Sequence, residues 1–371
     1  MKPEYLIPVF HNFSGVASGT LRKLYQDTPD FEYWWNASPE DFKRAISKNA
    51  EKIYPQLEKA RETIDFTKVE EYFIKEQIKI IPEFHSDYPE SLKNIDQPPF
   101  VLYWKGQINL PTIRVAMIGT RKFSTYGEKV CRYIAGDLAK SGITIVSGLA
   151  LGIDGIAHDE AVRQGGHAVA VLGGGVDTAS IYPATNRKLA DKILTSGGAI
   201  LSEYPPGTQP RSEYFPARNR IVSGLSRGVI VVEAAKKSGT MITAGMALDQ
   251  GRELFAVPGQ IFDKNTQGTH ELLKSGAHLI TSAEDVLEII GFQQTSTTGG
   301  SHQQTFQGTD EELTIYQTLQ AHPQGLSLNQ LAERTQTPTS SLMTTLTMLE
   351  MSGYTSQTQS GNYIALGNYT K

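Results

Sequence analysis

The clearest pattern in the chain is an alternation of short apolar runs with amphipathic segments from residue 113 onward. The runs are nearly continuous in Val, Ile and Ala, as in strands of a parallel sheet that helices cover on both faces. This pattern predicts an α/β fold with a doubly wound, mostly parallel sheet. The predicted strands read IRVAMIG, ITIVSG, AVAVLGGG, GAILSEYP, GVIVVEA and LFAVPG, and the predicted helices span 125–140, 154–164, 186–196, 218–225, 240–250, 269–274 and 283–290.

The stretch before these strands falls into two parts. Residues 5–67 read as short helices without strand alternation, and Trp34 and Trp35 are expected in their core, because large aromatic side chains bury readily. Residues 76–106 predict two strands and a short helix that extend the sheet, with 100–104 at the sheet edge after two prolines. We therefore expect an all-helical domain over 1–67 and the sheet domain over 68–290.

The last part of the chain has a different composition. Residues 291–309 are rich in Gln, Thr, Ser and Gly and predict a flexible linker. Helices at 311–321, 328–334 and 339–352, followed by a hairpin at 353–366, then form a winged-helix pattern over 310–371. This segment has only Arg334 and Lys371 as basic residues, which favours a protein-contact or vestigial module over a DNA-binding one.

The composition narrows the class of protein. With 371 residues, 39% of them hydrophobic and 20% charged, the chain is expected to form two or three globular domains. No apolar run is long enough to span a membrane and the start lacks a signal-peptide pattern, so a cytoplasmic protein is expected. The single Cys131 leaves no disulfide or cysteine metal site. The net charge is −4, yet residues 113–290 carry more basic than acidic side chains, so any polyanion should bind there.

The most suggestive polar groups lie between residues 215 and 243. Arg218 and Arg220 precede an apolar strand, and the turn Ser238-Gly239-Thr240 follows it and opens a helix. Guanidinium groups and the unpaired backbone N–H groups of a helix start can converge on phosphate oxygens. This stretch predicts an anion site at the carboxyl end of a strand.

Other predicted strands also end in small residues, at the edge where doubly wound folds bind ligands. Glycines there let a backbone approach a ligand, and Arg121 adds a third planar donor. Stacking faces that suit single-stranded nucleic acid lie in the same loops. Each residue alone is more often structural, but the whole set predicts a groove for phosphates and bases. Its glycines are Gly119, Gly148, Gly152, Gly173 and Gly239, and its aromatic residues are Tyr126, Tyr182 and Phe215.

Two other classes of function stay open. Familiar cofactor and acyl-transfer sites lose support, because the chain has no G-x-G-x-x-G, Walker A or G-x-S-x-G motif at a suitable place. A hydrolase could use Glu233, with Asp154 and Asp177 on other loops, to stabilise an oxocarbenium-like centre during N-glycosidic cleavage of a nucleotide. Glu233 could equally orient Arg218 or Arg220. A winged-helix transcription regulator is the third possibility.

Six ordered motifs resemble those of the DNA-processing protein A (DprA/Smf) family. They are GTRKFSTYG (119–127), VSGLALGIDGIAH (146–158), GGGVDTASIYP (173–183), SEYPPG (202–207), FPARNRIVSGLS (215–226) and VVEAAKKSGTMITAGMALDQGRELFAVPG (231–259). HSDYPESL (85–92) and QPPFVLYWKG (97–106) continue the likeness. The first domain is similar to that family's SAM-like or helix-hairpin-helix domain, and the tail is similar to its winged-helix domain. The middle is similar to its extended Rossmann-like domain.

The resemblance implies a non-catalytic protein that uses neither a cofactor nor a metal. Such a protein binds and protects incoming single-stranded DNA in natural transformation, loads the recombinase RecA onto it, and forms a homodimer through the Rossmann-like domain, with Leu272 and Leu273 as plausible contacts. Thr120 stands where many relatives carry serine, and the hairpin VASG departs from the family's usual turn. The fold also resembles cytokinin-activating phosphoribohydrolases, whose PGGxGT signature is not reproduced. The expected DNA-binding residues are Gly119, Thr120, Arg121, Ser147, Gly148, Phe215, Arg218, Asn219, Arg220, Ser238, Gly239 and Thr240.

Overall fold

The computed structural model describes residues 2–108, 113–292, 304–305, 309–320, 322, 325–351, 354–357, 362–365 and 369–370. These residues form two compact units, Met1–Gln294 and Thr295–Lys371, which we describe separately. The expected helical and sheet domains, 1–67 and 68–290, pack together within the first unit. Most of the predicted linker, 291–309, lies outside the described residues.

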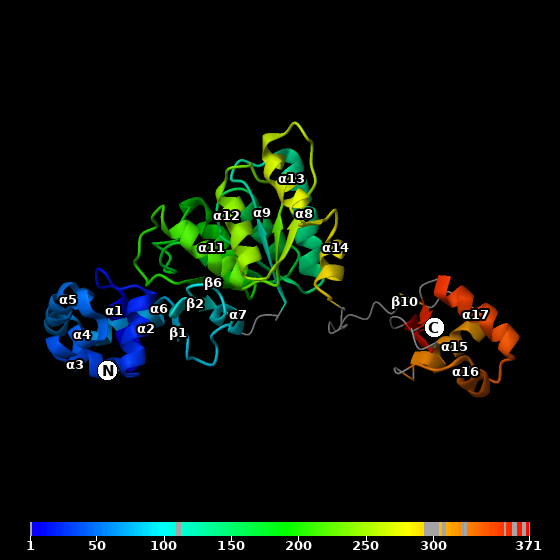
Figure 1. Ribbon diagram of the computed structural model, residues 1–371, viewed down its shortest axis with the longest axis horizontal. Coiled ribbons are helices and arrows are strands. Elements are labelled where there is room, and N and C mark those ends of the chain that lie inside the picture. The colour runs from blue at the N-terminus through cyan, green and yellow to red at the C-terminus, as the bar shows by residue number, and fades with distance from the viewer. Residues whose placement is uncertain are drawn as a thin grey trace. The chain divides into compact units, whose positions relative to one another are not determined.

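A nine-stranded sheet forms the centre of the first unit (Figure 1). The strand order is β1-β2-β6-β5-β4-β3-β7-β8-β9. The β1–β2 and β2–β6 pairs are antiparallel, and all the other pairs of this sheet are parallel. The predicted mostly parallel sheet is therefore confirmed, whereas the prediction that 100–104 lies at its edge is wrong, because β1 covers β2. The strands are β1 Lys79–Pro82, β2 Val101–Gly106, β3 Arg114–Ile118, β4 Thr144–Ser147, β5 Ala168–Leu172, β6 Ala199–Ser202, β7 Gly228–Val231, β8 Glu253–Ala256 and β9 His278–Leu279.

Helices cover both faces of the sheet, as the unbroken apolar strands require. Alternate residues of β3 show the two layers: Val115 and Met117 face one apolar cluster, and Ala116 and Ile118 face the other. The first cluster includes α8 (Thr125–Lys140), α9 (Ile153–Arg163), α10 (Arg187–Thr195) and α14 (Ala283–Ile289). The second includes α7 (Glu90–Lys93), α11 (Tyr214–Gly224), α12 (Gly239–Asp249) and α13 (Gln267–Lys274).

The segment before the sheet is helical, as predicted. Trp34 is fully buried and donates its indole N–H to the Leu24 carbonyl (2.8 Å), and Trp35 packs edge-on against Phe10. Ser38 and Asp41 form a reciprocal capping box at the start of one helix. The elements are η1 Pro3–Tyr5, α1 Leu6–His11, α2 Ser18–Asp27, α3 Phe31–Asn36, α4 Pro39–Ile46, η2 Ser47–Asn49, α5 Ala50–Thr63 and α6 Phe66–Lys75.

The second unit has the predicted winged-helix pattern. Its helices are α15 (Asp310–Gln320), α16 (Leu328–Thr335) and α17 (Thr339–Met351), and β11 (Thr355–Gln357) pairs antiparallel with β12 (Tyr363–Ala365). Ile315, Leu331 and Leu342 are buried in a small apolar core between the helices. β10 (Gln304–Thr305) lies within the predicted linker and pairs with β13 (Tyr369–Thr370).

Candidate nucleic-acid interface

The loops that follow β3 and β7 meet at the carboxyl ends of the strands. The Thr120 N–H donates to the Glu233 carbonyl (2.9 Å), and the Thr120 hydroxyl accepts from the Lys122 N–H (3.1 Å). Gly119 lets the start of α9 pack against this loop, because a Cβ there would lie 2.6 Å from Ile153. We call this edge, from Gly119 to Lys122 and around Phe215, the rim.

Arg121 and Phe215 lie together at the rim, where Arg121 is exposed and Phe215 is half-buried. The Arg121 guanidinium is exposed and lies 5.7 Å from the centre of the Phe215 ring, within the range of a cation–π contact. Tyr182, 53% exposed, lies beyond that ring at 5.8 Å. A cation and two ring faces that solvent can reach are the groups that hold a phosphate and neighbouring bases.

Arg218 lies near Arg121 but beneath the surface. It is only 4% exposed, and its guanidinium donates to the carbonyls of Gly148 (2.7 Å) and Val171. A Cβ on Gly148 would lie 2.4 Å from an Nη atom of Arg218, so glycine is required for this arrangement. Arg218 therefore supports the rim from inside the protein. Its position in the sequence had suggested a donor at the surface, and that prediction is wrong.

The charge of Arg218 is balanced by a buried acid. Burial lowers the pKa of Arg218 to about 10, against the opposing effect of the Asp154 carboxylate. Burial raises the pKa of Asp154, and both the Arg218 charge and the Gly148 N–H, which donates to Asp154 (3.1 Å), act in the other direction. Ser147 is also buried, and its hydroxyl donates to the Met117 carbonyl (2.6 Å). These groups shape the rim from below.

Arg220 does not join Arg218, although the two are close in sequence. Both lie within α11, and residues two apart on a helix point to different sides. One Nη atom of Arg220 donates to both carboxylate oxygens of Glu203 (2.8 and 2.9 Å), and its Nε donates to the Gln97 carbonyl (3.0 Å). Asn219 accepts a hydrogen bond from Arg218 (3.1 Å). The expected convergence of Arg218 and Arg220 on one ligand is therefore wrong.

The Ser238-Gly239-Thr240 turn opens α12, as predicted. Ser238 is the residue before the helix, and its hydroxyl has no hydrogen-bond partner among the described residues. Lys236 pairs with Glu271 (2.5 Å), while Lys237 is exposed. The free N–H groups at this helix start, together with Lys237, favour an anion.

The three carboxylates considered for hydrolysis are all engaged with the protein itself. Glu233 is fully buried and accepts from the Ser124 N–H (2.9 Å) and hydroxyl, so it supports the start of α8 and orients neither Arg218 nor Arg220. Asp177 accepts from the N–H groups of Ser180 (3.2 Å) and Gly207 (2.6 Å). Asp154 is buried and accepts from the Gly148 N–H, as described above.

The expected set of DNA-binding residues left out two basic residues, Lys122 and Lys237. Both are exposed, and each is adjacent to an expected site residue, which is the signal that could have identified them. Among the described residues no group of three or more His, Cys, Asp or Glu side chains could hold a metal ion. Within the same residues no helix is long and apolar enough to cross a membrane.

Comparison with known proteins places this site in a family. Residues 79–291 match the model of DNA recombination-mediator protein A, and residues 300–360 match that of the DprA winged helix domain. The chain belongs to the DNA recombination-mediator protein A (DprA/Smf) family.

Individual relatives agree with this assignment. The chain is 40% identical over 272 residues to DNA processing protein DprA of Bacillus subtilis, which covers 69% of this chain and 88% of that relative. It is 45% identical over 201 residues to the Streptococcus pneumoniae protein, over 54% of this chain and 70% of that one. The X-ray structure of the latter matches with a TM-score of 0.66 at 35% identity, over 77% of this chain and 97% of that one.

A second solved structure also matches this chain. It is DNA processing protein A from Helicobacter pylori, reported for its single-stranded DNA binding mode. It matches with a TM-score of 0.52 at 34% identity, over 58% of this chain and 95% of that one.

Proposed function

We propose that this protein binds single-stranded DNA along the rim and acts as a recombination mediator. The observation that carries the proposal is the exposed Arg121 guanidinium over the Phe215 ring, above the buried Arg218. A guanidinium can pair with a phosphate while adjacent ring faces accept unpaired bases. The single-stranded DNA binding described for the Helicobacter pylori relative supports this proposal.

The rim suits a single strand better than a duplex. Its two rings, the exposed Tyr182 and the half-buried Phe215, offer faces that only unstacked bases can cover. The glycines Gly119 and Gly148 let Ile153 and Arg218 pack directly against the loops at these strand ends. Paired bases in a duplex hide the surfaces that these rings would contact.

One binding experiment separates this proposal from the alternatives. The protein is titrated with a fluorescent oligo-dT and with a duplex of equal length at several salt concentrations, and release of free base from nucleoside monophosphates is followed in the same sample. We expect tighter single-strand binding that weakens with salt, and no released base. Base release that Glu233→Gln abolishes would instead support the phosphoribohydrolase-like enzyme. Duplex binding that is lost on deletion of residues 310–371 would support the transcription regulator.

Loading of RecA is the finer part of the proposed function, and it rests on the family resemblance. If the bound strand is handed over, RecA should hydrolyse ATP sooner on DNA coated with single-strand-binding protein when this protein is added. Arg121→Glu should remove that acceleration, because the strand is no longer held. An equal lag with and without the wild-type protein would contradict RecA loading. The same activity would serve incoming DNA in natural transformation.

We also propose a homodimer through the sheet domain, although not through the expected helix. Leu272 is buried in its own core, and Leu273 packs beside it. Ile261 and Phe262 are 72% and 92% exposed in the loop before α13, and Leu279 on the edge strand β9 is 57% exposed. Such adjacent apolar side chains suit a second copy of the same surface.

The dimer can be tested by mass measurement in solution. Phe262→Ser should shift the protein toward monomer in light scattering, because a fully exposed ring would lose its partner. The matched control is Ile74→Ser, which changes a 63% exposed apolar residue in α6. A dimer that survives Ile261→Ser and Phe262→Ser combined would place the interface elsewhere.

A further inference from the structure

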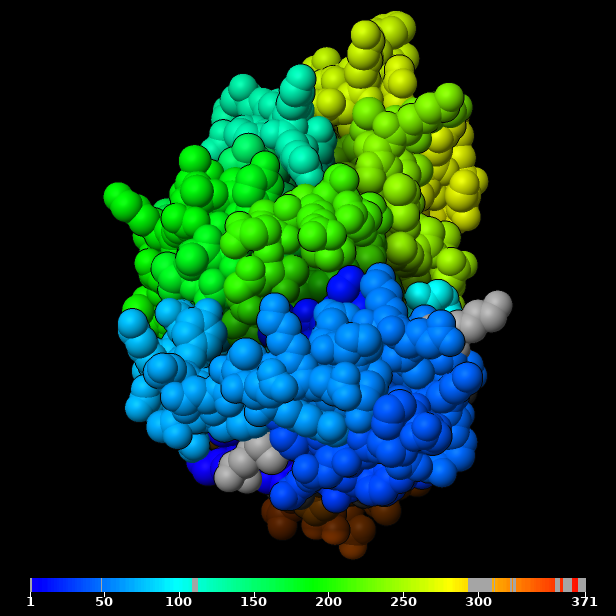
Figure 2. Space-filling model, turned by 90° about the vertical axis from the view of Figure 1, so that its left-hand side faces the viewer, coloured from blue at the N-terminus to red at the C-terminus, as the bar shows by residue number. Residues whose placement is uncertain are grey.

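A large cleft separates the N-terminal helices from the sheet domain (Figure 2). Its volume is about 1240 Å³, and it does not include the rim residues Arg121 and Phe215. One wall is the loop 12–17 with the start of α2, and the other is formed by residues 203–220 and the end of α12. The volume is ample for a nucleotide-sized group.

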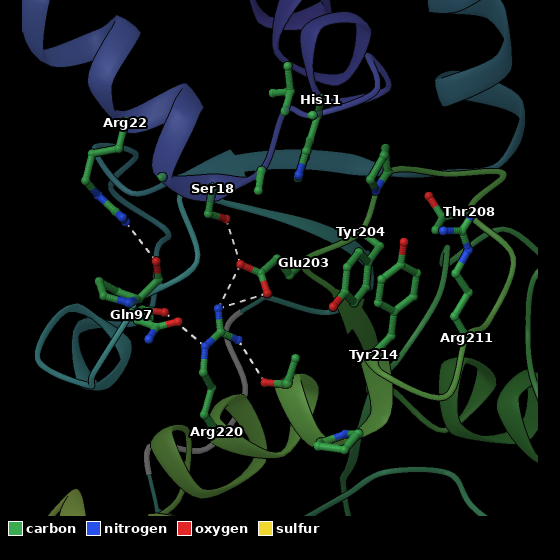
Figure 3. A pocket seen from close by; sticks show the side chains of 18 of the residues that line it. His11, Ser18, Arg22, Gln97, Glu203, Tyr204, Thr208, Arg211, Tyr214 and Arg220 are labelled. Carbon is green, nitrogen blue, oxygen red and sulfur yellow. Dashed lines mark hydrogen bonds and ion pairs between the residues drawn. The ribbon is translucent and has the colours of Figure 1, made fainter. Parts of the chain in front are cut away.

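Two stacked tyrosine rings and an arginine line the sheet side of the cleft (Figure 3). The rings of Tyr204 and Tyr214 stack with centres 4.0 Å apart and planes at 25°. The Arg211 guanidinium lies 5.8 Å from the Tyr214 ring on top of this pair. Arg211 is exposed, and no carboxylate of the described residues lies within 4 Å of it. This arginine is therefore able to move and stack on a ligand.

The charges inside the cleft are largely matched. Arg22 pairs with Glu83 (2.6 Å), and Arg220 pairs with Glu203 (2.8 Å). Ser18 also donates to Glu203 (2.6 Å), which ties the helical segment to the sheet across the cleft. Because these arginines are paired with carboxylates, the cleft does not attract a chain of phosphates, whereas the rim does.

Polar groups in the cleft suit the edge of a planar, neutral molecule. Side-chain amides of Gln56, Asn94, Gln97 and Gln250 line it. Gln250 donates to the Arg220 carbonyl (3.0 Å) and its Oε1 is buried, so this amide is held by the protein and is not open to a ligand. The side chains of Asn94 and Gln97 are exposed, and an amide can both donate to and accept from the edge of a planar ligand. Aromatic and guanidinium faces next to amides are the groups that recognise nucleobases.

The cleft and the rim meet at the start of α11. Tyr214 lines the cleft, and the next residue, Phe215, contacts Arg121 at the rim. Consecutive Cα atoms are about 3.8 Å apart, so adjacent nucleotides of one strand can reach both rings. A strand whose phosphates follow the rim can therefore turn one base into the cleft.

We propose that the cleft is a nucleobase site, in which a base stacks between the Tyr214 ring and the Arg211 guanidinium. This inference rests on the proposed single-strand binding and adds a site that senses bases as well as phosphates. The base replaces the present Arg211–Tyr214 contact, and its polar edge meets exposed amides such as Gln97. The phosphates of the same nucleotide stay outside, where the charge is unmatched.

Abasic scanning of a short oligonucleotide tests the site. Each base is removed in turn while the phosphates stay, and affinity is measured for the wild type and for Tyr214→Ala. We expect one or two positions at which base removal weakens wild-type binding about 5- to 100-fold, the range for loss of one stacked base. In Tyr214→Ala the same removal should have little effect. Tyr133→Ala, a change at an exposed ring of α8, is the matched control and should behave as the wild type.

A second pair of variants avoids any change to the stacked rings. Gly19 on α2 lines the cleft, and a Cβ there meets open space. Gly19→Trp should fill the cleft and abolish the sensitivity to base removal, whereas Gly19→Ala should keep it. The same abasic profile in the wild type, Tyr214→Ala and Gly19→Trp would overturn the base site while leaving single-strand binding intact. Absence of oligonucleotide binding by the wild type would instead contradict the proposed function itself.

Discussion

Replacement of Arg121 should weaken binding of a single strand without loss of the fold. The side chain is exposed, and no carboxylate of the described residues lies within 4 Å of its guanidinium. A hydrogen bond to a charged group contributes about 1.5–3 kcal/mol, and solvent exposure favours the lower end of that range. Arg121→Ala should therefore raise the Kd about 10- to 30-fold. Its effect on folding should stay below about 1 kcal/mol, because only the contact with Phe215 is lost.

The salt dependence shows whether the lost contact was with a phosphate. The Kd for oligo-dT is measured by fluorescence anisotropy over a range of salt concentrations, and the slope of log K against log salt should shrink by about 0.7 for one phosphate contact. Arg121→Lys should restore the slope but not the full affinity, because an ammonium group lacks the planar fork. The control is Arg227→Ala, an exposed arginine just before β7 and so at the opposite end of the strands. A wild-type slope in Arg121→Ala would refute a direct phosphate contact.

Other predictions concern the groups beneath the rim and between the parts of the first unit. Arg218→Met leaves the buried Asp154 carboxylate without its counter-charge and should lower the free energy of unfolding by about 3–5 kcal/mol in urea titrations. Asp154→Asn in the same chain should recover part of that loss, and equal stabilities of Arg218→Met and the wild type would contradict the pairing. Burial lowers the pKa of His11 to about 4 from 6.5, so the unfolded chain takes up the proton first as pH falls. This group should therefore cost the fold about 2 kcal/mol between pH 7 and pH 5, a loss that His11→Gln should remove. Gly152→Ala should lower the Tm by several degrees, because φ is +82° and the new Cβ would lie 2.4 Å from the Thr120 carbonyl oxygen. An unchanged Tm would show that this loop can shift.

The sheet could be predicted in detail from the sequence because its strands are short, unbroken apolar runs that only a doubly covered sheet accommodates. The predicted helix 125–140 coincides with α8, and the six predicted parallel strands all occur. The position of 100–104 was wrong, because two prolines favour an edge but do not reveal whether another strand covers it. The strand at the edge is instead β1, at 79–82, which pairs with β2.

The candidate site was less predictable. Arg121 and Phe215 lie together near the strand ends, whereas Arg220 turns toward Glu203. Residue type alone does not show which way an arginine points or whether it is buried. α11 begins at Tyr214, four residues earlier than predicted, but the predicted helix already contained Arg218 and Arg220. Residues two apart on a helix point to different sides, so the helix prediction itself argued against their convergence. The cleft could not be anticipated, because its walls depend on contacts such as Ser18 with Glu203, 185 residues apart in the chain.

The burial of Arg218 has a consequence for how the rim responds to dissolved ions. Salt screens charges that counter-ions can approach, and a guanidinium that is 4% exposed is largely out of their reach. Its charge is already balanced by the buried Asp154 carboxylate, so Arg218 adds little net positive potential at the surface. Attraction of an anion to the rim therefore depends mainly on Arg121, and it should weaken as salt screens that exposed side chain.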